Sequence, residues 1–338
     1  MATVTAPQSP SKPVVISERK EQIIRACLRY QYLTVVDLCF LLGLPNSRNY
    51  VRRLASRLAG NSDHADGHYL YRFALPQRTG GNARRVFVPG TASHELLRQT
   101  GEAPAAVIKP ATLQGYSYSY VVHNLAVARL AVCATLLYPE YVLAEIRLWS
   151  DLAARPPRVS LGAAGEETTI AVIPDCWVYL QRLTDGRGHV LWFEVDNATE
   201  AITAFKRRVR ARIALIASEA YAAYFGTPAV LLTYAVIGTD QKRREERCET
   251  LRQWTKAVLV QDQREDWAGT FRFAAIDYET LYEQQDALFL KPIWQLPDEP
   301  NPVALLTPPE TEETPHDPQT TSHIPGSASD ERFPPQAS

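Results

Sequence analysis

The chain has 338 residues, 46% of them hydrophobic, and a formal net charge of −1 at pH 7. That length suffices for two ordinary domains with buried cores, and the balanced charge excludes an overall basic character that would by itself indicate a nucleic-acid partner. No run of about 18 apolar residues occurs, so we expect no membrane-spanning helix and no membrane partner. The first residues, MATVTAPQSPSKP, lack a long apolar stretch, so we expect no signal peptide and a cytoplasmic protein.

The five cysteines are scattered along the chain, and no Cys-x-x-Cys spacing occurs. This arrangement indicates neither a zinc site nor a disulfide framework. Because most of them lie in apolar runs, we expect buried free thiols in a reducing compartment. They are Cys27, Cys39, Cys133, Cys176 and Cys248.

The nearly neutral total hides two charged ends. Residues 18–100 contain 13 lysines and arginines against 6 acids, a net charge of +7, whereas residues 297–338 contain 1 arginine against 8 acids, a net charge of −7. A basic region suits a polyanionic partner, although a solvated basic surface is the alternative. Residues 1–16 are rich in Pro, Ser and Thr, and the acidic tail from residue 297 holds ten of the 24 prolines, so both ends are expected to be disordered.

Residues 17–100 carry the sequence pattern of three helices followed by a β-hairpin. Apolar residues recur at helical spacing, and residues suited to helix caps and stops separate the three helices. Two short strand patterns flank a polar, glycine-containing loop. In this order the elements make a winged helix–turn–helix, a DNA-binding domain, which residues 101–115 link to the rest of the chain. The helices are expected at 18–30, at 35–42 and, after a cap at Asn46 or Ser47, to about Ala59; the strands are expected at 69–73 and 85–88.

The third helix of this domain has an apolar stripe on one side and arginines on the other. At about 100° per residue, four arginines flank two small polar residues on the exposed arc. Arginine makes bidentate contacts with guanine or phosphate, Asn makes them with adenine, and a helix N-terminus favours phosphate. A generic amphipathic surface helix and a winged helix that binds protein are the alternatives. The candidate DNA-binding residues are Arg48, Asn49, Arg52, Arg53, Ser56 and Arg57 in the helix and Arg84 and Arg85 in the hairpin.

Residues 116–296 follow a second pattern, in which strands and helices alternate. The expected order is helix, three strands, helix, strand, helix, strand, which predicts a mixed sheet with helices on both faces. We therefore expect an α+β protein, in which an N-terminal winged helix–turn–helix precedes a mixed-sheet α/β domain. The elements are expected at 120–137, 142–148, 170–180, 190–196, 201–224, 229–237, 243–259 and 271–276.

Three carboxylates stand out in this second domain. Strand alternation places Glu194 and Asp196 on one face. A turn over 184–189 sets Asp175 opposite Ala198, so that all three acids project from the same side. Acids gathered at one strand end repel one another unless a cation lies between them, and oxygen ligands of this kind suit Mg²⁺ or Mn²⁺. The three acids are therefore candidate metal ligands, and a structural cluster of ion pairs or helix-capping acids is the alternative.

Lys206 lies at the edge of the apolar stripe of the following helix, from which its side chain can reach back toward the acids. A lysine beside a metal-bound water can orient that water and stabilise the charge of a phosphoryl transition state. Lys206 is therefore a candidate catalytic residue.

These residues resemble the replication-relaxation family, whose members are typically encoded on plasmids and integrative elements. The resemblance runs from about residue 20 to 294 and rests on Ile173-Pro174-Asp175, on the segment 193–200 and on Lys206. It implies a DNA-binding accessory protein of plasmid or mobile-element replication, relaxation or mobilisation. A relaxase or a replication protein is the further partner that such a role implies.

The second domain also resembles the PD-(D/E)xK nuclease fold, which implies a restriction-endonuclease-like α/β domain. In that fold a strand Asp and a strand Glu hold Mg²⁺, and a lysine assists the attacking water. Carried over to this chain, Asp175 and Glu194 are metal ligands, and Glu194 and Lys206 are catalytic residues.

Two positions of the chain depart from the nuclease pattern. Asp196 stands where that motif normally has its lysine. The helix at 117–137 contains no acid, although such nucleases often supply a Glu from this helix. His123 and Glu145 are the stand-ins that the sequence offers.

The sequence leaves three functions open. The first is binding of double-stranded DNA as an accessory protein of a plasmid or mobile element. The second is Mg²⁺-dependent nicking or cleavage of DNA by Asp175, Glu194 and Lys206, for which Mg²⁺ or Mn²⁺ is the expected cofactor. The third is transcription regulation by a winged helix whose second domain mediates assembly.

Overall fold

Helices and three β-sheets form a mixed α/β structure, and all the described residues lie in the unit 1–307. The computed structural model describes residues 16–59, 69–75, 84–99, 117–137, 140–162, 168–198, 200–238, 240–283 and 285–307. The segments expected to be disordered at 1–15 and 308–338, and the linker expected at 101–115, lie outside the described residues. No helix in the described part of the chain is long and apolar enough to cross a membrane.

The N-terminal region consists of helices packed against a three-stranded antiparallel sheet of order β1-β3-β2. The three predicted helices and both predicted strands are present. A fourth helix is present that was not predicted. A two-residue strand was also not predicted, because two residues are too few to show an alternation. The elements are α1 (Glu18–Tyr30), β1 (Leu33–Thr34), α2 (Val35–Leu41), α3 (Arg48–Ala59), β2 (Leu70–Leu75), β3 (Arg84–Pro89) and α4 (Thr91–Gln99).

The local sequence explains where α2 and α3 form. The Asp37 carboxylate accepts a hydrogen bond from the backbone N–H of Thr34, which satisfies a donor that the start of α2 would otherwise leave free. Gly43 has a φ of 66°, a left-handed conformation that glycine adopts easily and that ends the helix. In α3 the apolar stripe is buried against α1, α2 and β2, and this leaves the arginine-rich side exposed.

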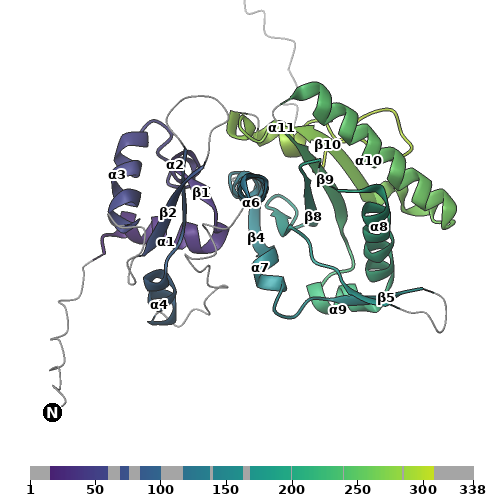
Figure 1. Cartoon of the computed structure of the whole chain (residues 1–338), viewed down its shortest axis with the longest axis horizontal. Helices are drawn as coiled ribbons and strands as arrows, with labels where there is room; N and C mark the ends of the chain where they lie inside the picture. The colour runs from purple at the N-terminus through teal and green to yellow at the C-terminus, as the bar shows by residue number, and fades with distance from the viewer. Residues whose placement is uncertain are drawn as a thin grey trace, which may run out of the picture. The chain divides into compact units, whose positions relative to one another are not determined.

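The second region is built on a five-stranded mixed sheet of order β10-β9-β8-β7-β4, which confirms the predicted mixed sheet. The strands β4, β7 and β8 run antiparallel, whereas β8, β9 and β10 run parallel. The helix α6 covers one face, and α8 and α10 cover the other (Figure 1). The elements are α6 (Tyr118–Thr135), β4 (Tyr141–Leu148), α7 (Trp149–Leu152), β5 (Arg158–Leu161), β6 (Thr168–Ala171), β7 (Cys176–Arg182), β8 (Gly188–Asp196), α8 (Ile202–Ala217), α9 (Glu219–Phe225), β9 (Leu231–Ile237), α10 (Gln241–Gln261), η1 (Glu265–Thr270), β10 (Phe271–Ile276), η2 (Leu281–Glu283) and α11 (Gln285–Leu290).

Alternation along β8 divides its side chains between the two faces. Phe193 and Val195 belong to the core beneath α6, whereas Trp192 belongs to the core beneath α8 and α10. Glu194 and Asp196 therefore project toward α8 and α10, as the period of two requires.

Two predicted elements were each wrong in extent, because a local break divides them. The strand expected at 170–180 is two strands, since residues 172–175, which include Pro174, leave the extended ladder, and β6 pairs with β5 while β7 joins the main sheet. The helix expected at 201–224 is also two, because Ser218 has the extended dihedral angles φ −94° and ψ 154° between α8 and α9.

Residues 297–307, which were expected to belong to a disordered tail, are ordered. Val303 exchanges backbone hydrogen bonds with Trp294, and Leu305 and Leu306 are buried in the main core. The hydroxyl of Tyr141 donates a hydrogen bond of 2.6 Å to the carbonyl of Thr307. This segment is therefore ordered although it is rich in proline, and composition alone did not predict the order of residues 297–307.

A buried polar cluster joins α2 to the second region. The Asp37 carboxylate accepts hydrogen bonds from Arg129 Nε at 3.0 Å and from the Tyr282 hydroxyl at 2.7 Å. Arg129 also donates to the carbonyl of Tyr278 at 2.8 Å. Burial and the Asp37 charge raise the pKa of Tyr282 well above its ordinary value, so its hydroxyl keeps the proton that it donates. We call these residues, Asp37, Arg129 and Tyr282, the α2 latch.

The predicted free cysteines are confirmed. All five are unpaired and buried. Burial raises the pKa of Cys27, Cys133, Cys176 and Cys248, so these thiols stay protonated and pack as small apolar residues.

Candidate nucleic-acid interface

Helix α3 presents the predicted arginines to solvent. Arg48, Arg52, Arg53 and Arg57 are all exposed, as is Asn49, and Ser56 is half-buried between them. Their placement follows from the buried stripe opposite, which fixes the rotation of the helix against the core. Within the described part of the chain, no carboxylate pairs with any of these four arginines. The Arg52 Nη2 atom donates instead to Asn49 Oδ1 at 2.8 Å, one turn earlier in the same helix.

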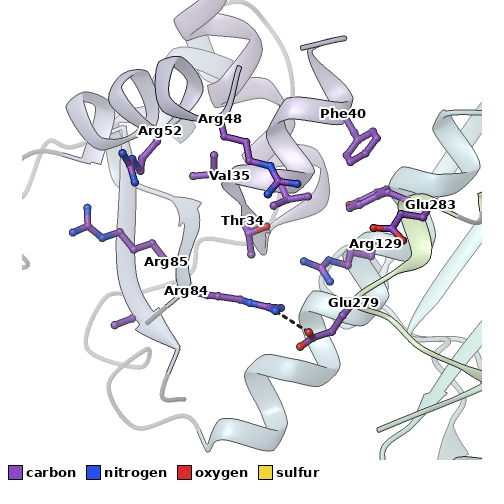
Figure 2. A pocket seen from close by; sticks show the side chains of 13 residues that line it. Thr34, Val35, Phe40, Arg48, Arg52, Arg84, Arg85, Arg129, Glu279 and Glu283 are labelled. Carbon is purple, nitrogen blue, oxygen red and sulfur yellow. Dashed lines mark hydrogen bonds and ion pairs between the residues drawn. The ribbon is translucent and has the colours of Figure 1, made fainter. Parts of the chain in front are cut away.

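An open cavity of about 780 Å³ lies beside this surface. Figure 2 shows that α3 and the β2–β3 hairpin contribute its arginines from one side, and that Arg129 and two glutamates approach from the other. The start of α2 forms part of its wall. Its charged lining residues are Arg48, Arg52, Arg84, Arg85, Arg129, Glu279 and Glu283.

The charges in this cavity are unevenly matched. Arg129 is held by Asp37, and Arg84 Nη2 lies 2.7 Å from Glu279 Oε2 in a half-exposed ion pair. Arg48, Arg52 and Arg85 have no carboxylate partner among the described residues, and Glu283 alone is left to offset them. The cavity therefore carries a surplus of positive charge, which attracts an anionic ligand.

The three carboxylates of the sheet region are matched in the opposite way, each by its own basic side chain. Glu194 lies 2.6 Å from Arg212 Nη2 and accepts a further hydrogen bond from Trp192 Nε1. Asp196 accepts both bonds of a bidentate contact with Arg247, each 2.9 Å long. Asp175 Oδ1 lies 3.3 Å from His123 Nε2 of α6.

The pKa values in this group follow from burial and pairing. Burial raises the pKa of Glu194, Arg212 opposes this, and Asp175 adds to the rise, so the net shift is upward. Burial also acts to raise the pKa of Asp175, but His123 and the backbone N–H of Val195 outweigh it, and the net shift is downward. For His123, burial acts to lower the pKa, and the Asp175 carboxylate raises it above its ordinary value.

The register predicted for Asp175 was wrong by four residues. Cys176 pairs with Phe193, so continuing the ladder by one residue brings Asp175 opposite Glu194 rather than Ala198. The turn has the expected length but begins two residues earlier than the turn expected at 184–189, because Arg182 and Arg187 share a backbone hydrogen bond of 2.9 Å. The shift is an even number of residues, so it keeps Asp175 on the same side as Glu194.

Lys206 lies half-buried near the start of α8. No hydrogen bond or ion pair joins Lys206 to Asp175 or Glu194 in the described part of the chain. Six residues separate it from Arg212, so at about 100° per residue the two side chains lie roughly 120° apart around α8. Arg212 is the residue that reaches Glu194, from a position inside the buried stripe of α8.

These carboxylates do not fit a divalent metal. Among the described residues, no group of three or more His, Cys, Asp or Glu side chains is arranged to hold one. Arginine guanidinium groups occupy the oxygens of Glu194 and Asp196 that a metal would need, and both acids are at least nine-tenths buried. Of the two stand-ins, His123 pairs with Asp175, whereas Glu145 pairs with Arg147 on its own strand.

The arginines that partner these acids were not predicted from the sequence. Arg212, Arg247 and Arg129 each meet an acid far away in the sequence. For Arg212 a signal was available, because a charged residue inside an apolar helical stripe must be paired when it is buried. The other two follow from tertiary packing, which spacing along the chain does not reveal.

No family model, no curated protein and no solved structure matches the chain. The resemblance to the replication-relaxation family therefore rests on the sequence of this chain alone.

Proposed function

We propose that this protein binds double-stranded DNA through a winged helix–turn–helix formed by α1 to β3, with α3 as the reading helix. The observation that carries the proposal is the set of exposed arginines on α3 and β3 that have no carboxylate partner in the described part of the chain and that border a cavity with surplus positive charge. The element order α1-β1-α2-α3-β2-β3 and the antiparallel sheet support it further.

The arginines have two roles in this proposal. Arg52 and Arg53, with Asn49 and Ser56, face the base edges, because they occupy the middle of the exposed arc of α3. The residues at the border of this surface hold the phosphate backbone and fix the register on the duplex. They are Arg48, Arg57, Arg84 and Arg85.

The biological role that we propose is that of a DNA-binding accessory of plasmid or mobile-element replication, relaxation or mobilisation. It rests on the resemblance of the residues at 173–200 and Lys206 to the replication-relaxation family. A relaxase or replication protein is the further partner. We do not propose DNA cleavage, because Arg212, Arg247 and His123 already neutralise the acids that would have to bind the metal.

The test is a fluorescence-anisotropy titration of the Arg52→Ala, Arg53→Ala double variant with duplex DNA at moderate salt. We expect affinity to fall at least about tenfold, because one bidentate arginine–base contact is worth about 1–3 kcal/mol. Arg207→Ala with Arg264→Ala is the matched control, since it removes the same charge from two exposed arginines outside the cavity. Equal affinity of wild type and the Arg52, Arg53 variant would overturn the proposal.

A second arm tests the absence of cleavage. Supercoiled plasmid incubated with the wild-type protein and Mg²⁺ or Mn²⁺ should remain supercoiled. Nicking that Asp175→Ala or Glu194→Ala abolishes would restore the nuclease hypothesis.

A further inference from the structure

We infer that a DNA strand bound at the α3–β3 surface continues to a second phosphate-binding site at the start of α10. This inference rests on the proposed DNA-binding function and extends it to the sheet region. The site is an open cavity of about 250 Å³. It lies where the parallel strands β8 and β9 end, between the first turn of α6 and the first turns of α10.

Arginine side chains from α10 dominate the charge of this cavity. Arg243, Arg244 and Arg247 line it, together with the acid Asp240. Arg247 is already matched by its bidentate contact with Asp196. Two arginines therefore face one carboxylate, which leaves a net positive charge.

The two unmatched arginines differ in how they are held. Arg244 is 9% exposed, and its Nη1 atom donates to the carbonyl of Gly238 at 2.6 Å. Its Nε atom is buried and has no hydrogen-bond partner among the described residues. A buried guanidinium with an unused donor lacks one of the hydrogen bonds that such groups normally make. Arg243 is exposed and has no carboxylate partner in the described part of the chain.

The N-cap of α10 indicates which groups can hold the phosphate. The Asp240 carboxylate accepts a hydrogen bond of 2.8 Å from the backbone N–H of Arg243 and so already occupies the N-terminus of the helix. A phosphate in this cavity is consequently held by the guanidinium groups of α10, and not by the backbone N–H groups at the start of that helix. It also experiences repulsion from Asp240, and this makes that residue a useful probe.

The second cavity adjoins the first through a short run of residues. Tyr278 lines the cavity at α10, and Glu279, the next residue, lines the cavity at α3. Arg129 lines the cavity at α3 and binds the Tyr278 carbonyl at 2.8 Å. Figure 2 shows Glu279 and Arg129 at the edge of that first cavity. A DNA strand that continues beyond the arginines of β3 therefore passes Tyr278 before it reaches Arg243.

The chemistry and the size favour a phosphate ester as the ligand. Arginine is the side chain best suited to a phosphate, because its planar donors match the oxygens in pairs. The cavity is smaller than the roughly 300–1,000 Å³ that small-molecule sites usually enclose, so one phosphate group fits it better than a whole nucleotide. A phosphate of the DNA backbone and free phosphate share this chemistry, and the experiment separates them.

The experiment compares two duplexes, of about 12 and about 30 base pairs, because one helical turn of DNA spans about 10 base pairs. Arg243→Ala should weaken binding of the longer duplex about fivefold and reduce the slope of log affinity against log salt by about 0.9, the value for one phosphate contact. It should leave the shorter duplex unaffected. Asp240→Asn keeps a capping side chain and removes the repulsive charge, so it should tighten binding of the longer duplex about twofold or more.

Lys256→Ala is the matched control, because it removes an exposed cation from the same helix outside the cavity. Affinity of Arg243→Ala equal to that of wild type for the longer duplex overturns the inference. Binding of inorganic phosphate that depends on Arg243, without any dependence on duplex length, also overturns it, because the ligand is then free phosphate. The Arg52, Arg53 double variant separates this result from failure of the proposed function: if it binds both duplexes as wild type does, the α3 surface itself is not the DNA site.

Discussion

The arginines of α3 and the carboxylates around β8 are two charged clusters that stand out in the sequence. In the folded chain they differ in one respect. Each acid around β8 has a cation within 3.3 Å, whereas the four arginines of α3 have no carboxylate partner among the described residues. Burial follows the same division, because Glu194 and Asp196 are buried and the α3 arginines are exposed.

Pairing and burial together distinguish a structural charge from a charge that is available to a ligand. A buried charge must be paired within the chain, since leaving it unpaired costs several kcal/mol. An exposed and unpaired charge costs little in the free protein and retains its full capacity to meet an external ion. The carboxylate cluster therefore contributes to the fold, and the α3 surface remains free to bind.

The first prediction, with the largest change, concerns how much the Glu194–Arg212 pair contributes to the free energy of unfolding. Arg212→Ala should lower the free energy of unfolding by about 3–5 kcal/mol, because it leaves a buried carboxylate without its cation. Chemical denaturation measures the change. Replacing both partners, Glu194→Leu with Arg212→Met, should cost less than the single change. A loss below about 1 kcal/mol for Arg212→Ala would show that the pair is not buried as described.

A smaller effect separates the two roles of the α3 arginines. Arg48→Ala should weaken DNA binding about tenfold and reduce the slope of log affinity against log salt by about 0.9, as expected for a lost phosphate contact. Arg53→Ala should weaken binding to the preferred sequence more than to other sequences. Anisotropy titrations at several salt concentrations measure both. Identical slopes and identical sequence preference in the two variants would remove the distinction between backbone and base contacts.

A still smaller effect tests the ion pair at the edge of the α3 cavity. Glu279→Gln should tighten DNA binding about two- to fivefold, because it frees Arg84 and removes a competing anion. Stability should change little, since exposed ion pairs contribute about 0–1 kcal/mol. Glu283→Gln, in the same cavity, is the matched comparison, because no ion pair of Glu283 exists in the described part of the chain. Weaker DNA binding by Glu279→Gln would mean that Glu279 supports the surface instead of competing for it.

The smallest effect concerns the pH dependence of the His123–Asp175 pair. The pKa of His123 is raised, so its contribution to stability is complete below its ordinary value of about 6.5 and is lost as the pH rises through the raised value. The pKa of Asp175 is lowered, so its contribution is lost as the pH falls through that lowered value. Wild type should therefore lose more stability than His123→Gln as the pH rises above about 6.5. Parallel pH profiles of the two proteins would contradict the pairing.

Much of the fold could be predicted from the sequence because the patterns are local. The stripe of Val51, Leu54 and Leu58 predicts both the existence of α3 and the side that its arginines face. The alternation along 190–196 likewise predicts that Glu194 and Asp196 share a face. The exposure of Arg52 and Arg53 follows from the same reasoning and is present in the structure.

The remaining features depend on interactions between distant parts of the chain. The register between β7 and β8 depends on the position of their turn, and a turn two residues earlier than expected moves the residue opposite Asp175 by four positions along β8. The choice of Arg212 over Lys206 depends on which side of α8 faces β8, and a lysine at the edge of an apolar stripe looks equally suitable in the sequence. The prolines of residues 297–307 predict disorder by composition, yet the segment is ordered by Trp294 and by the core beneath Leu306.

The α2 latch constrains how this protein can evolve. Asp37 sits at the start of α2, and its charge is neutralised by Arg129, ninety-two positions later, and bound by Tyr282, near the end of the compact unit. The N-terminal region transferred alone into another protein would leave the Asp37 carboxylate without the two side chains that bind it. The N-terminal region is therefore not an exchangeable cassette, and substitutions at these three positions should be inherited as a set.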